Sequence, residues 1–287
     1  MKNNIFPCLW FDGQGNEAAV FYTDTFKGKI TVNTPSVVNF ELFGQKFMIL
    51  NAGPQFQINA SISFTVICHT EDELQQYWER LVQNGKVLME LKSYEWSKKY
   101  GWVKDQYGVT WQLYLGESQN KQRIFPNLMF IRENNGKALE AMRFYTEIFP
   151  DSSMGRILKY GDGMGNESHE IPENVQHAHF SIDGYTLFCL DSSHPHEFNF
   201  NEAISLVVMT DDQVETDHLW NNLTSNGGRP SRCGWLKDPY GVSWQIVPKR
   251  LIELMNDPDP IRGHKVVQSM FTMEKIVISE LEKAYNS

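Results

Sequence analysis

One stretch of twelve residues occurs twice, and it constrains the fold more than any other feature of the sequence. The copies are Trp102-Val-Lys-Asp-Gln-Tyr-Gly-Val-Thr-Trp-Gln-Leu113 and Trp235-Leu-Lys-Asp-Pro-Tyr-Gly-Val-Ser-Trp-Gln-Ile246, and eight of their 12 positions are identical. The shared Asp-x-Tyr-Gly predicts a tight turn, because Gly108 or Gly241 supplies the dihedral angles that such a turn needs. The alternation after the turn predicts a strand whose Gln lies on the face opposite its Trp.

Other segments of the two halves also correspond, so the repeat extends along the chain. The matching pairs are Phe6–Phe11 with Phe125–Phe130, Phe21–Phe26 with Phe144–Phe149, and Glu73–Gly85 with Glu215–Gly227. Each half predicts a strand, a helix with its aromatic residues on one face, three strands, and a second such unit that ends in the twelve-residue block. The sequence therefore predicts an α+β fold of four βαβββ units.

The second helix of each half has clear start and stop signals. Each begins at an N-cap candidate followed three residues later by Glu: Thr70 with Glu73, and Asp212 with Glu215. Each ends at an Asn-Gly pair, at residues 84–85 and 226–227, where the glycine can adopt the left-handed conformation.

The clearest hairpin turns at the Asp-Gly pair of residues 183–184. Pairing outward from this turn sets His179 opposite Phe188 and His177 opposite Leu190, so both imidazoles share one face. Their spacing would suit a metal ion. A hydrogen-bonded or solvent-facing pair on a half-buried sheet explains the same two residues.

Composition bounds the partners and the compartment. The chain of 287 residues carries a net charge of −9, with its acidic residues dispersed, which argues against nucleic acid or an anionic membrane as the main partner. No apolar run approaches the ~20 residues that span a bilayer, and the start lacks the apolar core of a signal peptide, so we expect a cytoplasmic protein. The four cysteines are far apart and predict free thiols, mostly buried; Cys233, just before the second block, is the one to watch.

The C-terminal region has a different character. Asp257-Pro-Asp-Pro260 interrupts regular structure, and the apolar spacing over residues 262–284 predicts one amphipathic helix. This helix would pack on its own domain or form a homodimer contact.

These repeat units resemble a known family. Phe125-Pro-Asn-Leu-Met-Phe130, Phe144-Tyr145, the run from Cys233 to Pro248 and the segment from Met273 to Ala284 are similar to PhnB-like, or demethylubiquinone methyltransferase-like, proteins. These belong to the vicinal oxygen chelate superfamily of glyoxalases, bleomycin-resistance proteins and extradiol dioxygenases. The resemblance implies tandem glyoxalase-fold domains at residues 1–120 and 121–250, followed by a helical region at 251–287.

The resemblance also implies where a metal would lie, on the first and last strands of each unit. Only Gln112 and Gln245 stand where the family's terminal Glu is found, and a neutral amide is a weak ligand for a divalent ion. We therefore predict no cofactor. The alternative is a divalent metal held by His177, His179 and Gln245.

Three functions follow. The first is binding of a small organic molecule in an aromatic pocket without chemistry. The second is a metal-dependent glyoxalase-like lyase or dioxygenase, and the third is a non-catalytic scaffold, so whether the chain is an enzyme stays open. The candidate ligand-binding residues are Trp10, Trp102, Gln112, His177, His179, Cys233, Trp235 and Gln245.

Overall fold

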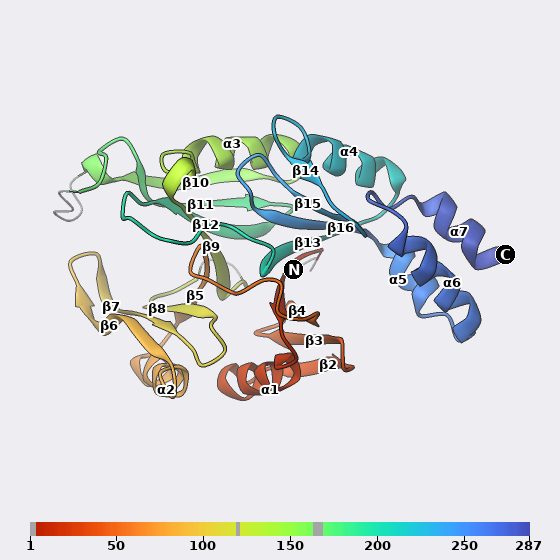
Figure 1. Cartoon of the computed structure of the whole chain (residues 1–287). Helices are drawn as coiled ribbons and strands as arrows, with labels where there is room; N and C mark the ends of the chain where they lie inside the picture. The colour runs from red at the N-terminus through yellow and green to blue at the C-terminus, as the bar shows by residue number, and fades with distance from the viewer. Residues whose placement is uncertain (1–3, 119–120, 163–168) are drawn as a thin grey trace. The chain divides into compact units, whose positions relative to one another are not determined.

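A computed structural model describes residues 4–118, 121–162 and 169–287 (Figure 1). The chain forms two compact units: Pro7–Ile204, and Asn4–Phe6 together with Ser205–Ser287. None of the helices in the described ranges is long and apolar enough to cross a membrane. The predicted boundaries at residues 120 and 250 stay predictions.

The four predicted βαβββ units are present, and the α+β class is confirmed. The first comprises β1 (Ile5–Phe11), α1 (Gly15–Phe26), β2 (Lys29–Asn33), β3 (Val37–Leu42) and β4 (Gln45–Asn51). The second comprises β5 (Ile62–Cys68), α2 (Glu71–Leu81), β6 (Lys86–Tyr94), β7 (Ser97–Lys104) and β8 (Thr110–Leu115). The third comprises β9 (Ile124–Phe130), η1 (Arg132–Asn134), α3 (Ala138–Ile148), β10 (Ser153–Lys159), η2 (Tyr160–Asp162), β11 (Val175–Ile182) and β12 (Tyr185–Asp191). The fourth comprises β13 (Ile204–Thr210), α4 (Gln213–Leu223), β14 (Arg229–Pro230), β15 (Trp235–Lys237) and β16 (Ser243–Pro248), and is followed by α5 (Lys249–Met255), α6 (Pro260–Phe271) and α7 (Ile278–Asn286).

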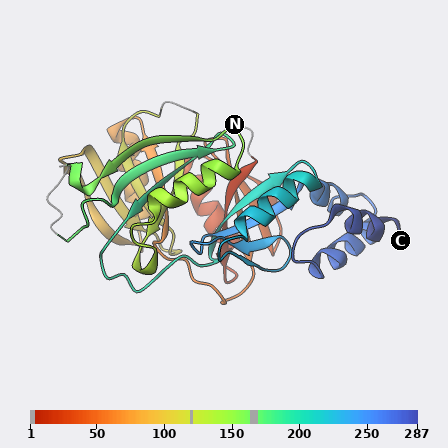
Figure 2. The ribbon, with the colours of Figure 1, turned by 90° about the horizontal axis from the view of Figure 1, so that it is seen from above.

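The second and third units share one sheet within the first compact unit. Its eight strands run in the order β10-β11-β12-β9-β5-β8-β7-β6, and the two halves meet where β5 pairs antiparallel with β9. This sheet is curved, and helices α2 and α3 pack on its outer side, α2 below β7 and β8 and α3 above β10 and β11 in Figure 1; Figure 2 shows the same ribbon from above. Tyr145 of α3 stacks on Phe180 of β11. We call the opposite side the helix-free face.

The twelve-residue block owes its repetition to a buried aspartate. Asp105 Oδ1 accepts hydrogen bonds from the backbone N–H groups of Tyr107, at 2.8 Å, and Val109, at 3.1 Å, and its Oδ2 accepts one from Trp111 Nε1 at 2.8 Å. In the second copy Asp238 makes the same three bonds, at 2.9, 3.0 and 2.8 Å. The predicted positive φ angles are confirmed at Gly108 (91°) and Gly241 (87°). One carboxylate thus fixes both the turn and the core tryptophan that follows it.

The predicted helix caps are confirmed. Thr70 Oγ1 accepts the N–H of Glu73, and Asp212 Oδ1 accepts that of Glu215. The stop signal differs in detail, because the left-handed residue after α2 is Asn84, with φ of 56°, and not the glycine that follows it. Asparagine tolerates this region better than most other residues.

The single C-terminal helix predicted over residues 262–284 is wrong, although helices are present there. The segment between α6 and α7 leaves the helix because its backbone carbonyls serve other partners: Met273 O accepts from Cys233 N, and Glu274 O from Gly234 N. Gln213 also donates to Ile276 O and accepts from the N–H of Ile278. Tertiary contacts therefore outweigh the helical spacing of the apolar residues.

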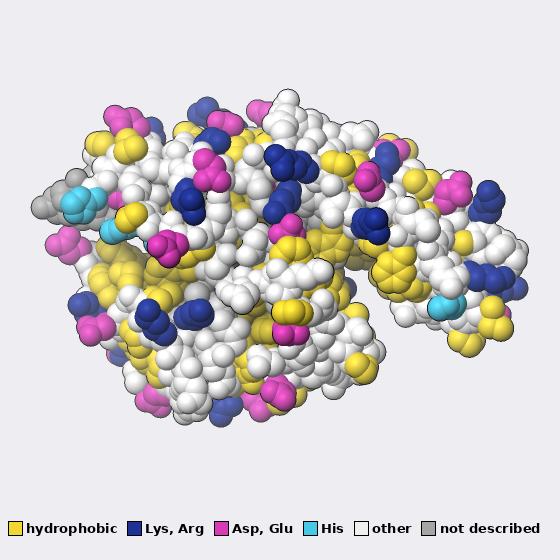
Figure 3. Space-filling view, viewed as in Figure 1, with side chains coloured by type: hydrophobic (Ala, Val, Ile, Leu, Met, Phe, Trp, Pro, Cys, Tyr) yellow, Lys and Arg dark blue, Asp and Glu magenta, His cyan; other side chains and the backbone are white. Residues whose placement is uncertain are grey.

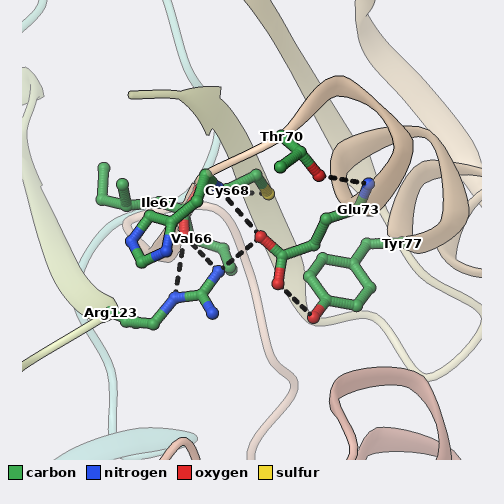
Figure 4. Close-up of polar contacts among 8 residues, drawn as sticks. Val66, Ile67, Cys68, Thr70, Glu73, Tyr77 and Arg123 are labelled. Carbon is green, nitrogen blue, oxygen red and sulfur yellow. Dashed lines mark hydrogen bonds and ion pairs between the residues drawn. The ribbon is translucent and has the colours of Figure 1, made fainter. Parts of the chain in front are cut away.

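An arginine at the start of the third unit fastens it to the second. Arg123 Nη2 lies 2.7 Å from both Glu73 Oε2 and Ile67 O, as Figure 4 shows, and its guanidinium lies 4.2 Å from the ring centroid of Phe43. Glu73 also accepts from His69 N and the Tyr77 hydroxyl. The carboxylate that caps α2 thus also anchors the chain entering β9.

Candidate functional site

Strand register gathers polar and aromatic side chains on the helix-free face. Directly paired residues share a face of a sheet, and so do alternate residues along each strand. One row of partners runs Trp102, Gln112, Thr65 and Phe125 across β7, β8, β5 and β9. The neighbouring row runs Ser63, Asn127, Phe188 and His179 across β5, β9, β12 and β11. In Figure 3 hydrophobic side chains line a recess on the left of the view, between the β6–β8 and β10–β12 parts of the sheet.

Three buried polar atoms in these rows lack a hydrogen-bond partner within the described part of the chain. They are the indole Nε1 of Trp102, the hydroxyl of Thr65 and the side-chain oxygen Oδ1 of Asn127. Asn127 is only 2% exposed and Thr65 only 5%. A buried polar atom without a partner costs on the order of 1–3 kcal/mol, so three in adjacent rows make this face the candidate site.

Gln112 lies between these atoms, and by contrast both polar atoms of its side chain have hydrogen-bond partners. Its Oε1 accepts from the Tyr100 hydroxyl at 2.9 Å, and its Nε2 donates to Ser63 Oγ at 2.7 Å. Burial raises the pKa of Tyr100, which keeps this hydroxyl a donor. In the fourth βαβββ unit Gln245 Nε2 likewise donates to Ser205 Oγ at 3.0 Å. Each repeat thus pairs its glutamine with a serine on the first strand of the same βαβββ unit.

Aromatic rings flank the polar atoms. Phe125 and Phe188 stack with centroids 4.7 Å apart and planes 3° from parallel. His177 and His179 meet the edge of the same Phe188, at 5.1 and 6.1 Å between centroids. The predicted opposition of His179 and Phe188 is confirmed.

The two histidines are held as neutral rings. Loss of surrounding water lowers the pKa of His177, even though the side chain keeps an exposed edge, and His179 and Arg156 lower it further. The pKa of His179 falls for the same first reason, with Arg156 second. The ring of His179 also lies so close to Gly155 of β10 that a Cβ added there would stand 2.2 Å from its Nε2. Glycine at this position thus makes room for the imidazole.

The other predicted site residues lie elsewhere. Trp235 and Gln245 are cross-strand partners in the fourth βαβββ unit, as Trp102 and Gln112 are in the second. Cys233 lies in the loop that packs on the C-terminal segment, where burial raises the pKa of its thiol. Trp10 lies at a separate hollow of about 510 Å³ in the first compact unit.

The residues at the family's metal positions do not fit a divalent ion. In the shared sheet those positions hold Ser63, Gln112, Asn127 and Phe188, none of which is a histidine or a carboxylate. The amide oxygen of Gln112 already accepts a hydrogen bond from Tyr100. Nowhere in residues 4–118, 121–162 and 169–287 do three or more His, Cys, Asp or Glu side chains gather as a metal site requires. The alternative ion at His177, His179 and Gln245 stays a prediction.

Comparison with known proteins decides the family. The model of the 3-demethylubiquinone-9 3-methyltransferase family matches residues 3–114 and 122–247, most of both halves. The chain belongs to this family. The predicted resemblance to PhnB-like proteins of the vicinal oxygen chelate superfamily is thereby confirmed. No curated protein matches the chain.

One solved structure supports the fold, and two others are similar in sequence over part of the chain. Glyoxalase I from Zea mays is 12% identical, with a TM-score of 0.56, over 85% of this chain and 91% of its own. A PhnB protein of Bacillus cereus, titled a putative 3-demethylubiquinone-9 3-methyltransferase, is 37% identical over 38% of this chain and 96% of its own, with a TM-score of 0.36. A protein from Staphylococcus aureus is 28% identical over 40% of this chain and 97% of its own, with a TM-score of 0.19.

Sequence reasoning missed several residues of the helix-free face. Five residues of these rows or beside them are not among the candidate site residues: Ser63, Thr65, Tyr100, Asn127 and Phe188. One signal was present: Ile62-Ser63 and Ile204-Ser205 correspond in the two repeats, as the glutamines do. Partners that recur together indicate a contact, and the two Ser–Gln hydrogen bonds are that contact.

Proposed function

We propose that the protein binds a small, ring-containing organic molecule on the helix-free face of the β5–β12 sheet, by direct contact with protein atoms. The observation that supports this most is the set of partnerless buried atoms, Trp102 Nε1, Thr65 Oγ1 and Asn127 Oδ1, beside the stacked Phe125 and Phe188. Ligand sites combine aromatic walls with a few such polar groups.

The register bounds the size and polarity of the ligand. Trp102 on β7 and Asn127 on β9 are three strand spacings apart, about 14 Å along the sheet at roughly 4.8 Å per strand. The side chains reach inward, so a molecule on the order of 10 Å long, two fused rings, would span them. Trp102 offers a donor and Asn127 an acceptor, which favours a ligand with an acceptor at one end and a donor at the other.

Methyl transfer, named in the family description, is not part of this proposal. A methyl-donor cofactor of the nucleotide type is usually held by a strand, a glycine-rich loop and a helix in a doubly wound sheet. The β5–β12 sheet instead has the strand order of two βαβββ units.

The test uses a matched pair of probes on protein freed of metal by a chelator. 7-Hydroxy-4-methylcoumarin, in mildly acidic buffer where its phenol is uncharged, has a donor and an acceptor at opposite ends, and its 7-methoxy analogue lacks the donor. We expect the hydroxy compound to bind more tightly, Asn127→Leu to remove that preference, and Trp102→Phe to weaken both compounds alike. Equal binding of the two compounds, or binding unaltered in both variants, would refute the site.

One observation favours a second candidate, a metal-dependent lyase or dioxygenase: His177 and His179 lie two residues apart on one face of β11. The matching test is metal analysis of protein purified without chelator. Stoichiometric metal that disappears in His177→Ala would favour this candidate over direct binding.

A further inference from the structure

A second hollow in the first compact unit is separate from the rows of the helix-free face. Its volume is about 510 Å³, within the range of small-molecule sites, and it lies where the end of β1, the loop after β4 and the β7–β8 turn meet. Its lining includes Trp10, Phe11, Phe56, Lys86, Lys104 and Tyr107.

Aromatic side chains give this hollow rigid walls. Trp10 and Phe56 pack edge to face with centroids 5.0 Å apart, and Trp10 is fixed by its Nε1 bond of 2.7 Å to Gly53 O. Phe11 and Tyr107 also meet edge to face, at 6.4 Å. The rings are therefore set in place before any ligand arrives, which suits a flat partner.

The lining of the hollow also carries two lysines, Lys86 and Lys104. Lys86 and Lys104 are direct cross-strand partners on β6 and β7, an arrangement in which like charges repel. Both side chains are exposed, and neither has an ion pair or hydrogen bond within the part of the chain that the structure describes. An anion between them would remove the repulsion.

The acidic groups nearby leave room for an anion. Asp105 lines the hollow, but its carboxylate is 3% exposed and its oxygens accept three bonds from within the protein. Asp12 is an exposed carboxylate of the lining. Its negative charge repels an anionic ligand, so removing that charge tests whether the ligand is an anion.

We propose that this hollow binds an aromatic anion, a carboxylate or phosphate carried on a flat ring system. The ring packs among Trp10, Phe56 and Tyr107, and the charged group lies between Lys86 and Lys104. In the fourth βαβββ unit the same cross-strand position is also basic, with Arg229 opposite Lys237, so the turn alone could favour such pairs. The aromatic walls and the volume set the first pair apart.

The experiment measures binding of 2-naphthoate, 2-naphthyl phosphate and uncharged 2-naphthamide by calorimetry. Both anions should bind more tightly than the amide. The phosphate will have a higher affinity than the carboxylate if the two lysines prefer a doubly charged group. Two exposed ion pairs contribute a roughly 2- to 30-fold change in Kd, so Lys86→Gln with Lys104→Gln should weaken the anions by this factor and leave the amide unchanged. Asp12→Asn should tighten the anions.

Matched variants test whether the lysines and the aromatic wall form one site. Lys98→Gln removes an exposed charge from the same strand, β7, and should change nothing. Phe56→Ala should weaken all three probes, because it removes a wall and not a charge. Equal anion binding by the parent protein and the double lysine variant would overturn the proposal, as would no binding at all. Loss of binding in Asn127→Leu would place the anions on the helix-free face instead.

Discussion

Replacing Asn127 by leucine should stabilise the unliganded protein while removing the acceptor that the proposed ligand on the helix-free face would use. Asn127 is 2% exposed, and its Oδ1 has no partner within the described residues. Removing an unsatisfied buried acceptor recovers about 1–3 kcal/mol, and leucine keeps the branched shape of asparagine, although its larger methyl groups offset part of that gain. We therefore expect a net gain of about 1 kcal/mol.

The matched control is the same substitution at a buried asparagine that does have a partner. Asn174 is 7% exposed and donates from Nδ2 to Asn135 Oδ1 at 2.9 Å. Asn174→Leu removes this bond and leaves the acceptor of Asn135 unpaired, which should cost about 1–2 kcal/mol. The two variants thus make the same chemical change with opposite expected signs.

The assay is urea unfolding of both variants and the parent protein, followed by tryptophan fluorescence and circular dichroism at equal protein concentration. Agreement of the two signals is needed, because a chain with two compact units can unfold in more than one step. The reasoning fails if Asn127→Leu destabilises the protein as much as Asn174→Leu does, since Asn127 would then be a satisfied structural residue.

Three further predictions concern the scaffold. Burial raises the pKa of Asp105 to about 6, so the contribution of this residue to stability should grow as the pH falls from 7 to 5. In urea unfolding, the difference in stability between the parent protein and Asp105→Asn should widen by about 1.3 kcal/mol over this range. A difference that does not change with pH would contradict this prediction. Gly155→Ala should displace the imidazole of His179, because the new Cβ would lie 2.2 Å from it, and unchanged NMR signals of that ring would refute the contact. Arg123→Met should cost about 2–3 kcal/mol in urea unfolding, since it leaves a half-buried carboxylate without its cation, whereas Lys29→Met at an exposed pair should change stability by less than about 0.5 kcal/mol.

The sign of the Asp105 effect follows from proton binding. The folded-state pKa lies above the ordinary value of 3.8, so between these two pH values the native protein binds more protons than the unfolded chain. Stability from this group is therefore present in acid and is lost as pH rises through about 6. Comparison with Asp105→Asn isolates it from other carboxylates, such as Glu73, whose pKa is lowered.

The repeat in the sequence was sufficient to predict the elements, because each βαβββ unit carries its own turn, cap and periodicity signals. It was not sufficient to predict how the units pair. The antiparallel contact of β5 with β9 joins the second unit to the third, and no local signal in either strand names the other. Both strands are buried on both faces, so hydrophobic pattern offers no preference between partners.

The site was only partly visible for the same reason. Trp102, Gln112, His177 and His179 were found because they stand in a repeated block or a clear hairpin. Thr65 and Tyr100 were missed because their roles depend on register across four strands. Cys233 was singled out by its place beside the block, and the structure puts it against the C-terminal segment, where its backbone N–H bonds to Met273.

Gln112, at the position of the family's metal-binding glutamate, has a structural role in this chain. If Gln112 bound a metal ion in place of the family's glutamate, its side-chain oxygen would need to be free to coordinate that ion. Instead Tyr100 donates to that oxygen while Ser63 accepts from the amide nitrogen. Its cross-strand neighbours, Trp102 and Thr65, are the residues left with partnerless atoms. In the proposed site the ligand contacts these neighbours of the glutamine, and a ligand that their side chains recognise would need no ion to hold it.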